Sequence, residues 1–315
     1  MQIFKGKFNI DFMGKRHLAI VLSALMIAVA IGSLVFKGLN LGIDFTGGTL
    51  IEVDYPQPAT LEAVRSTLSD AGFEQAQAQH FGSSRDVLIR IAPREGKESV
   101  QLSEDVLAAL RVQDAGVEME MRRVEFVGPQ VGEELTEQGA LAMIYALIGI
   151  LIYIMIRFQW RFAPGAVAAL VHDVLIIVGF FSFFQFDFDL TVVAALLAVI
   201  GYSLNDTIVV FDRIRENFRK MRKRTSLEVM NASINQTLAR TLMTSITTLL
   251  VLVSLFVFGG EVIHAFSLAL ILGVVVGTYS SIYVASTATL ALGVTKADLM
   301  PAKKEGEDQE GENFS

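Results

Sequence analysis

The distribution of hydrophobic and polar residues divides the chain into long apolar runs and one large polar insertion. The apolar runs occupy residues 18–36, 139–156, 164–186, 190–211, 241–258 and 263–293. Each is close to or above the roughly 20 residues that a helix needs to cross the hydrocarbon core of a bilayer. The pattern therefore predicts an α-helical integral membrane protein with six transmembrane helices.

The polar insertion between the first two spans shows a different periodicity. Strand-like patterns occur at residues 49–55, 87–91 and 117–127, and amphipathic helical patterns at 60–71 and 100–112. We interpret this as the order strand, helix, strand, strand, helix, strand of a ferredoxin-like α+β domain. At roughly 90 residues such a domain is large enough to bury its own core.

The predicted organisation has five parts. These are an N-terminal segment 1–17, a first span 18–36, the ferredoxin-like domain with its linker 37–138, the remaining helices 139–295 and an acidic tail 296–315. The linker 128–138 is expected to be a semi-rigid coupling element. The tail has too few apolar residues to offset the entropy of ordering and is predicted to be disordered.

Basic residues alternate between connections and thereby predict the topology. Lys and Arg are concentrated in the N-terminal segment, at Arg157 and Arg161, and along 213–224, whereas the connections 185–189 and 259–264 contain neither. Because short loops rich in Lys and Arg are retained in the cytoplasm, both termini are expected inside and the α+β domain outside. A cleaved signal peptide ending near Ala30 is the alternative for the first run, but this run continues to Phe36, beyond the usual length of about 7 to 15 residues.

Composition narrows the class of protein further. The chain has 315 residues, of which 52% are hydrophobic, and it contains no cysteine. The apolar excess is typical of a membrane protein, and the missing thiols exclude disulfides and thiolate metal sites. The basic run 213–224 is explained by topology and contact with anionic lipid, so we expect no nucleic-acid partner.

The most informative polar residue is Asp206, which lies inside the fourth apolar run. A charged Asp at the centre of a membrane helix costs about 2.5 to 3.5 kcal/mol on insertion scales, so the position predicts an ion or proton site. Ser203 and Asn205 share a polar stripe with it on a helical wheel. They are either ion-coupling groups or polar contacts that hold two helices together.

Two further sets of polar residues lie at comparable depth. Arg240, with Thr244 one turn later, begins the fifth span and is either an ion-pair partner of Asp206 or an interfacial anchor. His172 and Asp173 in the third span are either a proton relay or a fixed hydrogen-bonding pair.

In the last span, 273–277 has a small-xxx-small pattern, which predicts close packing against the fourth or fifth span.

A glycine-rich string, Asp44-Phe45-Thr46-Gly47-Gly48, follows the first span. It lacks the spacing of a phosphate-binding loop, and a tight turn before a strand is enough to explain it. The four scattered histidines offer no metal-ligand spacing.

Several of these strings resemble the SecF family of the bacterial SecDF complexes, within the resistance-nodulation-division superfamily. The similar strings are Asp44 to Gly48, Val124-Glu125-Phe126-Val127-Gly128-Pro129, His172-Asp173, Gly201-Tyr202-Ser203-Leu204-Asn205-Asp206 and Asp212-Arg213-Ile214-Arg215-Glu216-Asn217. The resemblance implies that Asp206, Arg240 and Thr244 take part in cation movement. It also implies an inner-membrane protein without enzymatic activity or a cofactor, coupled to H+ or Na+.

The partners implied by the resemblance are a SecD subunit, the SecYEG translocon, an unfolded preprotein handled by the outer domain, and YajC and YidC. The implied function is late-stage protein export driven by a cation gradient. Three alternatives stay open: an exporter of small lipophiles from the same superfamily, a passive assembly factor, and an intramembrane aspartyl protease using Asp173 and Asp206. Against the protease, no GxGD string surrounds either acid.

Overall fold

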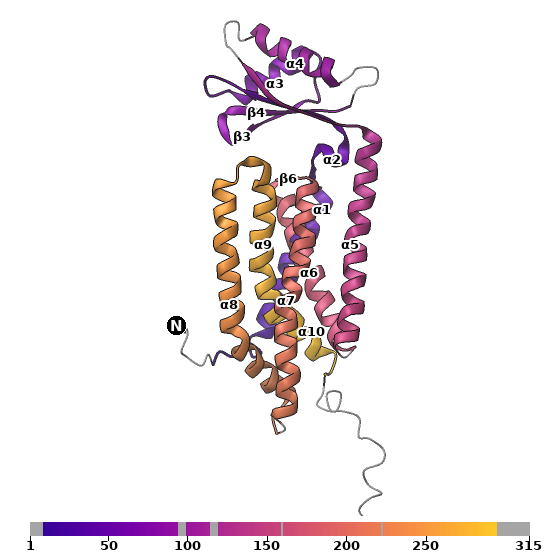
Figure 1. Ribbon diagram of the computed structural model, residues 1–315, viewed down its shortest axis with the longest axis vertical. Helices are drawn as coiled ribbons and strands as arrows, with labels where there is room; N and C mark the ends of the chain where they lie inside the picture. Colours follow the sequence, from indigo (N-terminus) through magenta and orange to yellow (C-terminus); the bar gives the residue numbers. More distant parts are fainter. Residues whose placement is uncertain (1–8, 94–98, 114–118, 159, 222, 295–315) are drawn as a thin grey trace, which may run out of the picture.

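The computed structural model describes residues 9–93, 99–113, 119–158, 160–221 and 223–294. A helical bundle carries a small α+β domain at one end (Figure 1). Six spans in the described part are long and apolar enough to cross a membrane: α1 (Arg16–Phe36), α5 (Pro129–Arg157), α6 (Phe162–Phe184), α7 (Leu190–Lys220), α8 (Ser226–Phe258) and a last span, His264–Ala291. The predicted fold class is confirmed. The predicted disorder of the tail concerns residues outside the described ones.

The last span changes helix type partway along its length. After the short turn η1 (Glu261–Ile263), it consists of α9 (His264–Ser280), a π-helical segment η2 (Ser281–Ala285) and α10 (Ser286–Ala291). The hydroxyl of Ser286 donates to the carbonyl of Ser281 at 3.2 Å, five residues earlier. Such π-helical turns are rare and frequently mark functional sites.

Several helices are longer than their apolar runs. α5 begins at Pro129, so the predicted linker 128–138 is in fact mostly helix. Pro is favourable at the first helical position because the missing N–H has no intrahelical acceptor there. α8 begins at Ser226, where Thr225 and Glu228 form a reciprocal capping box. Hydropathy therefore located the membrane-buried part of each helix and missed the polar turns beyond it.

The α+β domain has the predicted ferredoxin-like topology. Its elements are β2 (Gly48–Asp54), α3 (Leu61–Asp70), β3 (Gln77–Phe81), β4 (Ser83–Ile91), α4 (Ser99–Gln113) and β5 (Glu120–Val127). The four strands are ordered β3-β4-β2-β5, and all neighbours are antiparallel. β3 is the strand that the sequence pattern did not locate. The two helices cover the sheet face that points away from the bundle (Figure 1).

A short junction joins the domain to the bundle. β1 (Asn40–Leu41) pairs in parallel with β6 (Asp187–Phe188), in the turn between α6 and α7. Asp187 forms an ion pair of 2.5 Å with Arg90 of β4 and accepts a hydrogen bond of 2.8 Å from Gln79 of β3. The turn before α7 is thus bonded directly to the sheet.

Candidate functional site

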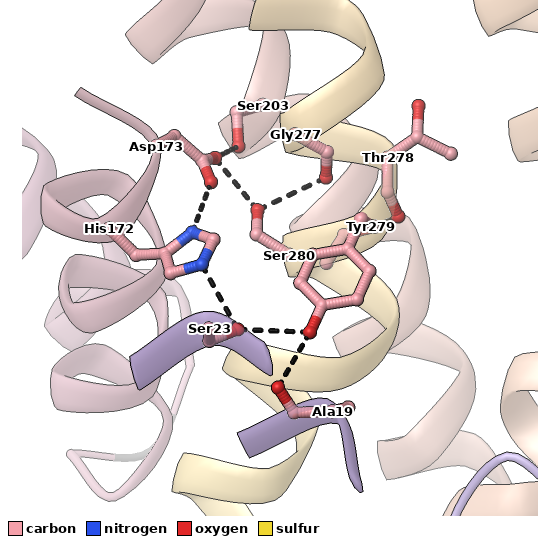
Figure 2. Close-up of polar contacts among 10 residues, drawn as sticks. Ala19, Ser23, His172, Asp173, Ser203, Gly277, Thr278, Tyr279 and Ser280 are labelled. Carbon is pink, nitrogen blue, oxygen red and sulfur yellow. Dashed lines mark hydrogen bonds and ion pairs between the residues drawn. The ribbon is translucent and has the colours of Figure 1, made fainter. Parts of the chain in front are cut away.

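The first polar cluster is centred on Asp173, whose side chain is 1% exposed. One carboxylate oxygen contacts Nδ1 of His172 at 2.9 Å. The other accepts hydrogen bonds from Ser203 of α7 at 2.6 Å and from Ser280 of α9 at 2.7 Å (Figure 2). The carboxylate therefore ties three helices together inside the bundle.

The cluster continues from His172 to α1. Nε2 of His172 contacts the hydroxyl of Ser23 at 3.1 Å, and this hydroxyl contacts that of Tyr279 at 2.9 Å. Tyr279 in turn donates to the carbonyl of Ala19 at 2.8 Å (Figure 2). We call the set Ser23, His172, Asp173, Ser203, Tyr279 and Ser280 the buried network.

The hydrogen bonds of the buried network fix its proton count. Tyr279 uses its single hydroxyl proton on Ala19, so Ser23 must donate to Tyr279. Nε2 of His172 must then donate to Ser23, and a further proton must lie between Nδ1 and Asp173. The His172–Asp173 pair is therefore either imidazolium with carboxylate or imidazole with carboxylic acid. Both states have zero net charge, which suits burial in a membrane.

The order carboxylate, imidazole, hydroxyl is also that of a hydrolytic triad. Here, however, the hydroxyl proton of Ser23 is directed at Tyr279 rather than at the imidazole. The contacts are those of a fixed link between helices, which is one of the two roles predicted for His172 and Asp173. The relay role stays a prediction.

The second polar cluster surrounds Asp206, one turn beyond Ser203 on α7. Asp206 is 3% exposed, and its Oδ2 has no hydrogen-bond partner among the described residues. Three hydroxyls on α7 and the neighbouring helix α8 share this property, namely those of Tyr202, Thr207 and Thr241. A buried polar group without a partner is costly, so such a group requires an explanation.

Arg240 is the cationic residue whose charge acts on Asp206. The two attract each other through space but form no ion pair within 4.0 Å in the described structure, and Arg240 is exposed on α8. The hydroxyl of Thr244 donates to the carbonyls of Arg240 at 3.2 Å and Thr241 at 2.8 Å. The predicted pair thus lies on the neighbouring helices α7 and α8 without forming an ion pair in the described structure.

The structure divides the polar stripe that the sequence indicated on α7. Ser203 is fully buried and belongs to the buried network, whereas Asn205 is exposed. The sequence reasoning missed Ser23, Tyr279 and Ser280. Their only signal was a hydroxyl inside an apolar run, which is common in membrane helices.

The predicted close packing of the last span is confirmed against α7. A methyl group on Gly277 would lie 3.1 Å from Cβ of Ser203, and one on Gly273 would lie 2.1 Å from Val199. Glycine at these positions therefore allows α9 to reach the buried network.

The glycine-rich string was expected to be a tight turn before a strand. The structure instead has a one-turn helix, α2 (Ile43–Thr46), which Gly47 links to β2. Gly47 and Gly48 have φ values of +67° and +126°, and a side chain on Gly48 would lie 2.5 Å from the carbonyl oxygen of Ile91. Asp44 accepts a hydrogen bond of 2.9 Å from the backbone N–H of Leu190, the first residue of α7. The string therefore connects the α+β domain to the helix that carries Asp206.

The described residues contain no group of three or more His, Asp or Glu side chains placed to hold a metal ion. The unpartnered Oδ2 of Asp206 is a carboxylate oxygen, a ligand type that suits a proton or a hard cation. Six candidate spans, a buried Asp206 with an unpartnered carboxylate oxygen and an α+β domain at one end of the bundle are the features of a multi-pass membrane transport protein.

Comparison with known proteins identifies the family. The sequence family model for the C-terminal region of the protein export membrane proteins SecD and SecF matches residues 108–295. The family model for the SecD/SecF GG motif matches residues 32–59. Protein translocase subunit SecF of Vibrio alginolyticus is 55% identical over 98% of both chains. The SecF subunit of Pseudomonas aeruginosa is 53% identical over 93% of this chain and 94% of the relative. The chain belongs to the SecD/SecF family and, within it, to the SecF translocase subunits.

Two solved structures show the same architecture. The crystal structure of SecDF, a translocon-associated membrane protein from Thermus thermophilus, superposes with a TM-score of 0.82 at 38% identity. SecDF in a super-membrane-facing form superposes with a TM-score of 0.68 at the same identity. Each match covers 92% of this chain and 39% of the solved chain, so the chain spans well under half the length of either SecDF.

Proposed function

We propose that the chain, together with a SecD partner, uses a cation gradient of H+ or Na+ to promote late-stage export of preproteins across the bacterial inner membrane. The observation that carries this proposal is the unpartnered Oδ2 of buried Asp206. A charge that crosses the membrane field releases about 2.3 kcal/mol per 100 mV. A carboxylate that alternately binds and releases a cation is able to use this energy.

The position of the exposed polar residues supports completion of the site by a partner. Asn205 and Arg240 are exposed on α7 and α8, on either side of Asp206 in the sequence. In pseudo-symmetric transporters the coupling site lies at the interface of two repeats. We propose that SecD supplies the second repeat, and that SecYEG, YajC, YidC and the emerging preprotein are further partners.

The orientation in the membrane follows from the same proposal. The start of α1 and the end of α10 lie at the end of the bundle away from the α+β domain (Figure 1). The basic segment of α7 that includes Arg213, Arg219 and Lys220 extends toward that end. We place this end in the cytoplasm and the α+β domain in the periplasm.

The bonds at the junction support transmission between the cation site and the domain. Asp44 and Asp187 bond the beginning of the domain and its sheet to the first residues of α7 and the turn before it. A rearrangement of α7 driven by Asp206 is therefore passed to the domain, which we propose grips and releases the preprotein.

The test is replacement of Asp206 by Asn in the complex reconstituted with SecD and the translocon. We expect the stimulation of export by a membrane potential or ion gradient to be lost, because the amide does not exchange a cation. Asp212→Asn is the matched control, since Asp212 lies on the same helix but is half-exposed and pairs with Arg157 at 3.4 Å. Assembly is checked by co-purification with SecD.

Full export by Asp206→Asn with normal assembly would contradict the proposal and favour a passive assembly factor. The identity of the cation is tested separately. Export or cation current is measured with and without Na+ at fixed pH, and a signal that needs Na+ identifies sodium.

A further inference from the structure

A large apolar groove lies beside the buried network. Its volume is about 830 Å³, within the roughly 300 to 1,000 Å³ of typical ligand sites. α1, α6 and the last span form its walls, with a contribution from α5. Ser23 and His172 also line it, and the two are hydrogen-bonded to each other within the buried network.

The groove is open at the surface of the bundle and at membrane depth. Ile20 of α1 and Val171 of α6 line it and are 47% and 39% exposed. Two further lining residues, Ala24 and Ala168, are exposed although their side chains are small. Small residues on facing helices leave a furrow into which a chain of the surrounding lipid fits.

The π-helical segment forms one wall of this groove. Tyr283 and Val284, which line it, belong to η2, where the last span departs from α-helical geometry. The departure changes the direction of the side chains that follow, including Thr287, which also lines the groove. The hydroxyl of Thr287 is buried without a hydrogen-bond partner in the described structure. The irregular helix and this unpaired hydroxyl coincide with the groove.

Cationic and aromatic side chains mark the end of the groove where α1 and α6 begin. Lys15 and Arg16 lie one helical turn before the lining residues Ala19 and Ile20. Just before the start of α6, Trp160 is 65% exposed and the guanidinium of Arg161 lies 5.5 Å from its ring centroid. Trp is enriched at membrane interfaces, and basic clusters there attract anionic headgroups.

We infer that this groove binds one acyl chain of an anionic phospholipid, whose headgroup lies against Lys15 and Arg16. The apolar walls fit the acyl chain and the basic rim fits the phosphate. The positive charge of the rim favours a phospholipid over an apolar helix of a partner. The phospholipid supplies an anionic phosphate, whereas an apolar helix does not.

The single tryptophan of the chain provides the probe. The full chain is placed in bilayers of phosphatidylcholine with a minor fraction of phosphatidylglycerol, and bromine is attached near the headgroup of one lipid or the other. Brominated phosphatidylglycerol is expected to quench Trp160 at lower mole fraction than brominated phosphatidylcholine. Equal quenching by the two lipids would overturn the inference.

Two variants separate the acyl chain from the headgroup. Ala168→Phe fills the groove and is expected to abolish the preference, whereas Leu25→Phe, on an exposed position of α1 outside the groove lining, is expected to keep it. Lys15→Gln with Arg16→Gln is expected to lower the preference about fivefold for each charge removed. Lys220→Gln, at the end of α7, is the charge control.

A preference for phosphatidylglycerol that survives both Ala168→Phe and the double substitution would contradict the site. Native mass spectrometry of the complex with SecD tests the other occupant. Retention of an anionic phospholipid by the wild type and its loss in Ala168→Phe support the inference. A wild-type complex that retains no such lipid overturns it.

Discussion

Two buried carboxylates on neighbouring helices have opposite surroundings. Asp173 is 1% exposed and makes three hydrogen bonds or close polar contacts, to His172, Ser203 and Ser280. Asp206 is 3% exposed, yet one of its oxygens has no partner among the described residues. Burial therefore does not distinguish the two acids, and their hydrogen bonds do.

The proton count of the buried network sharpens the contrast. The His172–Asp173 pair has no net charge in either of its two allowed states, so it needs no bound counter-ion. The charge of Arg240 acts on Asp206 through space, and Oδ2 of Asp206 has no hydrogen-bond partner among the described residues. A buried network in which every member is satisfied rigidifies a structure, whereas an unpartnered buried group requires an explanation.

The largest predicted effect follows from removing the centre of the buried network. Asp173→Ala leaves His172, Ser203 and Ser280 without their partner, and breaking a buried pair costs about 3 to 5 kcal/mol. We expect the free energy of unfolding in detergent to fall by this amount, measured by denaturant titration. The matched substitution Asp206→Ala removes an acid with an unpartnered oxygen and is expected to cost far less. Equal losses in the two variants would contradict the contrast between the acids.

A smaller effect is expected from crowding the buried network. In Gly277→Ala the added methyl group would lie 3.1 Å from Cβ of Ser203, and overpacking typically costs about 1 to 3 kcal/mol. Gly201→Ala on α7 is the control, because nothing lies within 4 Å of the added methyl group. Thermal unfolding of both variants measures the difference. A wild-type midpoint for Gly277→Ala would show that α9 moves away at no cost.

The smallest effect is expected beside Asp206. Thr241→Val replaces a buried hydroxyl that has no partner with a methyl group of similar shape, so the change in unfolding free energy is expected to be about zero or slightly stabilising. Ser280→Ala, which removes a bond to Asp173, is the comparison and should cost about 1.5 to 3 kcal/mol. Strong destabilisation by Thr241→Val, measured under the same conditions, would reveal a partner for this hydroxyl.

The sequence predicted the elements with strong periodicity and missed those without it. The six spans and the ferredoxin-like order follow from apolar runs and alternation. β3 was not predicted, because Gln77, Gln79 and His80 have little β propensity. The start of α5 at Pro129 was not predicted, because hydropathy does not detect a polar helical turn outside an apolar run.

The candidate site was predictable only in part for a related physical reason. An acidic residue within an apolar run can be recognised from the sequence alone, so Asp206 and Asp173 could be selected as candidates. Their difference depends on contacts between helices: Ser280 lies 107 positions from Asp173, and Ser23 lies 149 positions from His172. No local pattern specifies which hydroxyl meets which acid.

The junction between sheet and bundle has a mechanical consequence. Arg90 and Gln79 hold Asp187, while Asp44 holds the first backbone N–H of α7. Tension applied to the sheet is transmitted to the first residues of α7 directly, by an ion pair and a few hydrogen bonds. A pull on the domain therefore acts on the N-terminal end of the helix that carries Asp206.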